Sequence, residues 1–126
     1  MVESKILRDK NIVIGVTGGI ACYKVLDLIK ELRKLRANVY VILTKNALNL
    51  IDKNEFENVS GNKVQIELFD PDINYKDYIK KNKPIKHISL ADSADLVLIC
   101  PATANIIGKI AYGIADDLLS TSIMAT

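Results

Sequence analysis

The sequence has few of the residues that mark disulfide scaffolds, metal centres and nucleic-acid-binding surfaces. Its 126 residues include two cysteines and one histidine, and the cysteines have neither metal-site nor redox-pair spacing. We therefore expect reduced thiols, no metal and a cytoplasmic location. The net charge is only +2, and the basic cluster at 80–83 has no interleaved aromatic residues, which argues against a nucleic-acid partner. No signal peptide or membrane-length apolar run is present, so no membrane partner is expected.

The remaining composition is typical of a globular domain. Hydrophobic residues make up 49% of the chain and charged residues 25%. The sequence contains no repeats, low-complexity tracts or linkers, and a chain of this length can bury about two-thirds of its unfolded surface. We therefore expect a single domain over residues 1–126.

An apolar run followed by a glycine turn forms the most informative segment. Ile12–Val16 predicts a strand that is buried on both faces, as in a parallel sheet. Thr17–Gly19 breaks the run, and apolar residues then recur at helical spacing over 20–35. The glycines are expected to allow positive φ and close backbone approach. Free N–H groups at the start of such a helix suit an anion, most often a phosphate, and a tight turn without a ligand is the alternative.

Two further apolar runs predict two more strands of the same sheet. Asn38–Leu43 is rich in β-branched residues, and Leu96–Cys100 is wholly apolar and is expected to be another central strand. Intervening helices require parallel crossovers, so the sequence predicts an α/β, Rossmann-like three-layer sandwich around a parallel sheet. The other expected elements are helices over 47–51, 54–60, 91–94, 105–112 and 117–124, a strand over 63–69 and a loop over 70–84.

Small, hydroxyl and amide side chains follow the predicted strands, in Thr17–Gly19, Thr44–Asn46 and Thr103–Asn105. In an open parallel sheet, ligands bind beyond the carboxyl ends of the strands, so these segments predict a neutral binding site. The chain has neither the G-x-G-x-x-G dinucleotide fingerprint with an acidic second strand end nor the Gly-Lys of a Walker motif. A monophosphate with a polar ring system, such as flavin mononucleotide (FMN), suits such a lining.

Three other features have both structural and functional interpretations. His87 is either a capping or hydrogen-bonding residue, or a general base or substrate-orienting group. Cys22 and Cys100 are interpreted as core residues rather than nucleophiles. The pair Asp116–Asp117 predicts a helix cap and a subunit contact rather than a metal site.

Five segments, in order along the chain, carry a resemblance to a known family. They are Gly15–Lys24, Val41–Ala47, His87–Ala91, Ala94–Asn105 and Gly113–Thr121. Together they resemble the flavin-dependent cysteine decarboxylases, a flavoprotein family, over nearly the whole chain from Asn11. Within the fourth segment, Pro-Ala-Thr-Ala-Asn is similar to the family's P-A-S-A-N-T signature, with Ile106 at the position of the last threonine.

The resemblance implies FMN bound at a subunit interface, usually in a homotrimer or an assembly of trimers. By position, it implies phosphate contacts from Gly18, Gly19 and Ile20, second-strand contacts from Thr44, Lys45 and Asn46, and isoalloxazine contacts from Thr103, Ala104, Asn105 and Ile106. His87 matches the family's catalytic histidine. Position 19 often carries serine in the family, so Gly19 leaves the phosphate loop to backbone donors.

The reaction that the resemblance implies is decarboxylation of phosphopantothenoylcysteine to phosphopantetheine in coenzyme A biosynthesis, with a fused or separate synthetase partner. Oxidation of the thiol end to a thioaldehyde provides the electron sink that a simple cysteine carboxylate lacks. The family's P-x-M-N segment and flap cysteine would follow Thr126, so we expect 1–126 to be an FMN-binding flavoprotein domain lacking its C-terminal substrate-clamp region. A flavin prenyltransferase-like enzyme and a non-catalytic FMN-binding or assembly subunit are the alternatives.

Overall fold

A parallel sheet forms the middle layer of the computed structural model, which describes residues 6–66 and 86–126, with the side chains of 86–89 outside the description. Its strands are β1 (Asn11–Val16), β2 (Asn38–Leu43) and β3 (Leu96–Ile99). They lie in the order β2-β1-β3, with Asn11 opposite Asn38 and Ile12 opposite Leu96. All of these pairings are parallel, as the sequence predicts.

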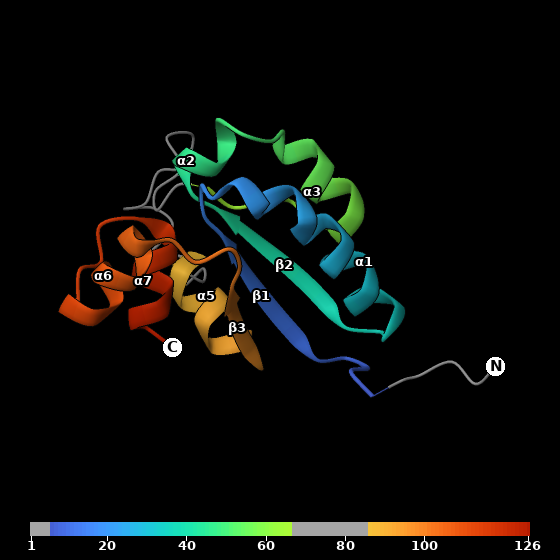
Figure 1. Ribbon diagram of the computed structural model, residues 1–126. Coiled ribbons are helices and arrows are strands. Elements are labelled where there is room, and N and C mark those ends of the chain that lie inside the picture. The colour runs from blue at the N-terminus through green and yellow to red at the C-terminus, as the bar shows by residue number, and fades with distance from the viewer. Residues whose placement is uncertain (1–5, 67–85) are drawn as a thin grey trace, which may run out of the picture.

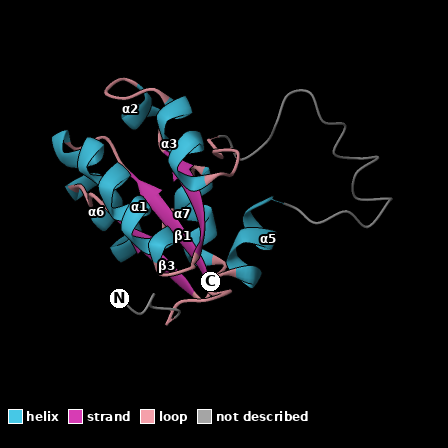
Figure 2. Cartoon of the chain, turned by 90° about the vertical axis from the view of Figure 1, so that its right-hand side faces the viewer, coloured by secondary structure: helices cyan, strands magenta, loops and turns pink. Residues whose placement is uncertain are grey.

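Helices cover both faces of the sheet. They are the 3₁₀ helix η1 (Ile20–Lys24) and the α-helices α1 (Val25–Lys34), α2 (Lys45–Leu48), α3 (Lys53–Ser60), α5 (Lys86–Ser93), α6 (Ala104–Tyr112) and α7 (Leu118–Met124). In Figure 1, α1 and α3 lie on one side of the strands and α5, α6 and α7 on the other. Figure 2 shows α1 and α3 in front of the strands. The predicted three-layer α/β sandwich is therefore confirmed.

Alternation along β1 divides the core between the two faces. Ile12, Ile14 and Val16 pack into a cluster with residues of α1 and α3, whereas Val13 packs into a second cluster with residues of α6 and α7. Side chains that alternate between the faces of a strand require apolar neighbours on both sides. The continuous apolar run that predicts β1 thus reflects burial on both faces.

The predicted central position of the third strand is wrong within the described residues. β3 lies at an edge, beside β1 alone, and Leu96 is 53% exposed. An apolar run fixes that a strand exists but not its neighbours, because strand order depends on the crossovers. On the opposite edge, β2 pairs with Gln65 through an isolated parallel bridge.

Other element boundaries differ locally from the prediction. The helix expected over 20–35 begins as η1, whose N-cap residue Gly19 offers no side-chain acceptor. An uncapped first turn commonly tightens into 3₁₀ bonds, here from Cys22 N–H to Gly19 C=O at 3.0 Å. The helix expected over 91–94 extends back to Lys86. Of the strand expected over 63–69, the described part forms only the bridge at Gln65, and the loop expected over 70–84 lies outside the described residues.

Both cysteines are free thiols, Cys22 buried and Cys100 half-buried, and both pack with the α1–α3 side of the core. Their interpretation as core residues is consistent with this packing. Across 6–66 and 86–126, none of the helices has the length and apolar character needed to cross a bilayer.

Candidate functional site

A cavity of about 640 Å³ opens at the carboxyl ends of the strands. Its volume lies within the range of small-molecule sites. Gly18 after β1, Thr44 after β2 and Asn105 in α6 all contribute to its wall. The other lining residues are Thr17, Leu43, Lys45, Asn46, Ile66, Thr103, Ile106, Lys109, Asp116, Asp117, Leu118 and Leu119. The predicted edge of the sheet therefore carries a shared cavity, rather than a crevice filled by bulky side chains.

Gly18 lets two turns approach closely at this edge. A Cβ atom added at Gly18 would lie 2.7 Å from Asn46 Cβ and 3.1 Å from the Asn46 carbonyl carbon. The expectation of a positive φ is wrong, because the glycines with positive φ are Gly61 and Gly113. Close backbone approach, rather than left-handed geometry, explains why this position has no side chain.

Helix starts converge on the cavity, and their caps differ. The hydroxyl of Thr44 accepts a hydrogen bond from Ala47 N–H at 3.4 Å, and Thr103 accepts one from Ile106 N–H at 3.5 Å. At η1, by contrast, Gly19 provides no side-chain acceptor. The first N–H groups of a helix have no intrahelical partners, and a positive end without a cap favours an anion. The glycine turn is consequently the part of the cavity rim best suited to an anionic group.

The turn before η1 is also fixed from the side of β3. Thr17 is 3% exposed, and its hydroxyl donates a hydrogen bond to the Pro101 carbonyl oxygen. A Cβ at Gly19 would lie 3.1 Å from Pro101 Cγ. The segment after β3 therefore packs against the glycine turn, which leaves little freedom in the relative positions of the two strand ends.

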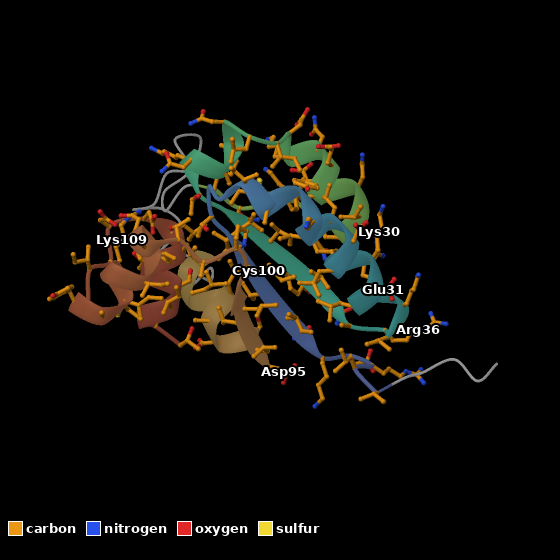
Figure 3. The ribbon with its side chains drawn as sticks, in the orientation of Figure 1. Lys30, Glu31, Arg36, Asp95, Cys100 and Lys109 are labelled. Carbon is orange, nitrogen blue, oxygen red and sulfur yellow. The ribbon has the colours of Figure 1, made fainter. Side chains whose placement is uncertain are left out.

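Three charged side chains, Lys109, Asp116 and Asp117, line the cavity where α6 ends and α7 begins. Lys109 Nζ lies 2.9 Å from Asp116 Oδ1 and 3.4 Å from Asp117 Oδ2. The Lys109 side chain is 17% exposed, and Figure 3 labels it on the α6 and α7 side of the sheet. A hydrogen bond to Asp116 raises the pKa of Lys109, and burial lowers it. The negative charges of Asp117 and Asp116 add to the first effect, so the pKa is raised overall. Lys109 therefore remains a cation at the cavity wall.

Asp117 is also the cap of α7. Its Oδ1 accepts hydrogen bonds from Ser120 N–H at 2.8 Å and from the Ser120 hydroxyl at 2.5 Å, while Asp117 N–H donates to Ser120 Oγ at 3.2 Å. Burial would raise the pKa of the Asp117 carboxyl, but the bonds from Ser120 and Lys109 outweigh it and lower the pKa. This reciprocal arrangement is a capping box, and it confirms that the acidic pair opens the last helix.

Seven of the ten residues predicted to contact a cofactor line the cavity together. They are Gly18, Thr44, Lys45, Asn46, Thr103, Asn105 and Ile106. Gly19, Ile20 and Ala104 are outside the lining, and Ile20 is 86% exposed. His87 belongs to the first turn of α5 by its backbone, and its side chain lies outside the described part. The role of each of these residues stays a prediction.

The predicted neutral lining is wrong. Lys109, Asp116 and Asp117 reach the cavity because the chain returns from α6 to start α7 at the same edge of the sheet. Sequence reasoning considered strand ends alone and therefore missed them; the acidic pair after Gly113 was the available signal. Within the described ranges, no three His, Cys, Asp or Glu side chains gather closely enough to hold a metal ion.

The chain matches a family model described as Flavoprotein over residues 2–126. The coenzyme A biosynthesis bifunctional protein CoaBC of Haemophilus influenzae is 42% identical over 120 residues, covering 95% of this chain and 28% of that protein. CoaBC of Bacillus subtilis is 41% identical over 121 residues, covering 94% of this chain and 27% of that protein. The chain thus spans roughly a quarter of the length of these curated relatives.

Solved structures share the fold. The FMN-dependent cysteine decarboxylase SpaF has a TM-score of 0.81 at 27% identity, over 95% of this chain and 65% of SpaF. The FMN binding protein AtHal3 has a TM-score of 0.72 at 28% identity, over 94% of this chain and 60% of AtHal3. Sequence identity and fold agree with the family match, and the chain belongs to the Flavoprotein family.

Proposed function

We propose that this chain binds FMN in the cavity and serves FMN-dependent decarboxylation of phosphopantothenoylcysteine to phosphopantetheine in coenzyme A biosynthesis. The observation that carries the proposal is the single cavity shared by Gly18, Thr44 and Asn105 at the carboxyl edge of the sheet. Further support comes from relatives named CoaBC and from similar structures named as FMN-dependent cysteine decarboxylases.

The cavity residues suit the two ends of FMN. Gly18 and the uncapped start of η1 would hold the phosphate, with Lys45, which is exposed, as a nearby cation. Thr103 and Asn105 would bond the polar edge of the ring, and apolar residues such as Leu119 would cover its face. FMN, when bound, would supply the oxidation of the substrate's thiol end that creates an electron sink for the loss of CO₂, and then the return of the hydride that gives phosphopantetheine.

His87 is the proposed acid–base or substrate-orienting residue. Support comes from its place in the His87–Ala91 segment, which resembles the family motif, and from α5, which packs against the cavity-lining α7. An imidazole titrates near neutral pH and so can take or return a proton under physiological conditions. We expect His87→Asn to retain FMN and to lose decarboxylation in a form of the protein that turns over.

We further propose that residues 1–126 act as one FMN-binding domain in a homotrimer or an assembly of trimers. Support comes from Ile20 on η1 and Tyr112 on α6, which are 86% and 85% exposed, because contact with another copy would remove this apolar surface from water. A synthetase partner, fused or separate, is proposed from the bifunctional name of the relatives. A cytoplasmic location is proposed from the two free thiols.

The proposed function is tested by titrating the purified chain with FMN and following flavin fluorescence. Saturable one-to-one binding is expected, weakened about five- to tenfold in Asn105→Ala by the loss of one hydrogen-bonding side chain. Asn54→Ala is the matched control, because Asn54 lies on α3 across the sheet. Failure of the chain to take up FMN would contradict the proposal.

Release of CO₂ from phosphopantothenoylcysteine is the second readout. Release by the FMN-loaded protein, abolished in His87→Asn, would support the decarboxylase. FMN binding without release by a protein that forms trimers would instead favour the non-catalytic FMN-binding subunit. Transfer from dimethylallyl phosphate to reduced FMN would favour the prenyltransferase-like alternative.

A further inference from the structure

The N-terminal cap of α7 is complete without Lys109. Asp117 is held by two bonds from Ser120, at 2.8 and 2.5 Å, and these close the capping box without Lys109. Asp116 is 61% exposed and pairs at 2.9 Å with Lys109, whose side chain is only 17% exposed. The cost of taking such a cation out of water offsets much of the attraction in the pair, so the pair by itself is weak evidence of stabilisation. The position of Lys109 therefore calls for an explanation other than the stability of α7.

The cavity wall offers that explanation. Lys109, Asp116 and Asp117 all line the cavity, and their formal charges sum to −1. Lys45, which is exposed, lines the same cavity from the start of α2. The cavity thus has a cation beside the glycine turn, and a carboxylate-rich wall that would oppose an anionic ligand if Lys109 were missing.

We propose that Lys109 is a positioning residue that limits the negative charge of the α6–α7 wall: by pairing with Asp116 and Asp117, it keeps the formal charge of these three side chains at −1 and so preserves the cavity's preference for a phosphorylated ligand over the unphosphorylated one. The proposal rests on the proposed FMN site and adds what selects FMN over riboflavin there. Removing Lys109 changes the formal charge of the wall from −1 to −2, and neutralising Asp116 changes it from −1 to 0.

A change in the charge of the wall alters the affinity for FMN, which carries a phosphate, much more than the affinity for riboflavin, which carries none. At a high effective dielectric constant and a separation of about 10 Å, one unit of charge acting on a phosphate dianion changes the affinity about five- to tenfold, and salt reduces this effect. Lys109→Met is therefore expected to lower the affinity for FMN by about that factor, and Asp116→Asn to raise it. Neither variant should change the affinity for riboflavin comparably.

The experiment measures dissociation constants for FMN and riboflavin by fluorescence titration at low and high salt. It compares the wild type with Lys109→Met, Asp116→Asn and the control Lys30→Met. Lys30 is exposed on α1, across the sheet from Lys109 (Figure 3), and its replacement changes the net charge equally. The FMN-to-riboflavin affinity ratio should fall in Lys109→Met, rise in Asp116→Asn, stay constant in Lys30→Met and converge at high salt.

Equal losses for both flavins in Lys109→Met, or an unchanged ratio in Asp116→Asn, would overturn the role of Lys109 while leaving the FMN site intact. A wild type that binds neither flavin would instead contradict the proposed function. Should Lys109→Met fail to fold, Asp116→Asn decides alone, because the two variants move the ratio in opposite directions.

Discussion

The two faces of the sheet are built differently. On one face, α1 and α3 close over a continuous apolar cluster in which Phe56 and Ile29 are fully buried. On the other, five buried residues form the cluster among the side chains that the structure describes, and the cavity lies between the strand ends, α6 and α7. A face that packs completely contributes stability, whereas an incompletely packed face can admit a ligand. The larger of the two apolar clusters thus lies under α1 and α3, and the cavity lies at the strand ends beside α6 and α7.

The largest effect is expected on the face of the sheet that α1 and α3 cover. Phe56→Ala removes a ring that is 0% exposed beneath α3. We expect a loss of about 3–5 kcal/mol in the free energy of unfolding, because the transfer energy is lost and a cavity remains. Urea denaturation monitored by circular dichroism measures it. A loss below about 1 kcal/mol would mean that this face can collapse around the gap.

Gly15→Ala tests the close packing between β1 and the cavity-lining residue Leu119. A Cβ at Gly15 would be in steric conflict with Leu119 Cδ1 and would lie 3.2 Å from Leu119 Cγ. Because Leu119 lines the cavity, the displaced side chain is expected to enter it. We expect a loss of about 1–3 kcal/mol in stability together with weaker FMN binding. Unchanged FMN affinity in a destabilised variant would show that Leu119 moves elsewhere.

The cap of α7 gives a smaller effect that depends on pH. Asp117→Ala removes an N-cap and is expected to cost about 1 kcal/mol at neutral pH. The folded state lowers the pKa of Asp117, so its contribution is complete above the ordinary value of 3.8 and is lost as pH falls through the lower, folded pKa. Denaturation of both proteins from pH 7 to pH 2 should show their stabilities converging. A constant difference across that range would contradict the ionised cap.

The smallest expected effect is a gain. Ser122 is 2% exposed, and its hydroxyl has no hydrogen-bond partner within the described structure. Ser122→Ala should leave stability unchanged or raise it by up to about 1 kcal/mol, because an unpaired buried hydroxyl is removed. Ser120→Ala is the matched control two residues away, and it should destabilise because its hydroxyl is paired. Equal losses in both variants would mean that Ser122 bonds a partner.

Elements that depend on the local sequence could be predicted on both faces of the sheet. Asn38–Leu43 is both the predicted and the observed second strand, and the helix before Gly113 ends where that glycine takes a φ of 69°. These features are encoded locally, by β-branched apolar runs and by a C-terminal glycine. Local signals of this kind also placed the glycine turn at the edge of the sheet.

The face covered by α5, α6 and α7 was less predictable, because it depends on how separate helices and strands are placed in space. The place of β3 beside β1 depends on the crossover that precedes it, and the charged wall around Lys109 depends on how the chain returns from α6 to α7. The lysine and its partners are seven and eight residues apart, across a helix end and a turn, so no helical spacing links them. Such a pairing becomes visible only once α6 and α7 are placed in space.

A crystal structure of the chain grown with FMN tests the account most directly. The account predicts electron density for one flavin per chain in the cavity, with its phosphate beside Gly18 and its ring toward Asn105. Flavin density on the α1–α3 side of the sheet, or a phosphate turned toward Asp116, would contradict it.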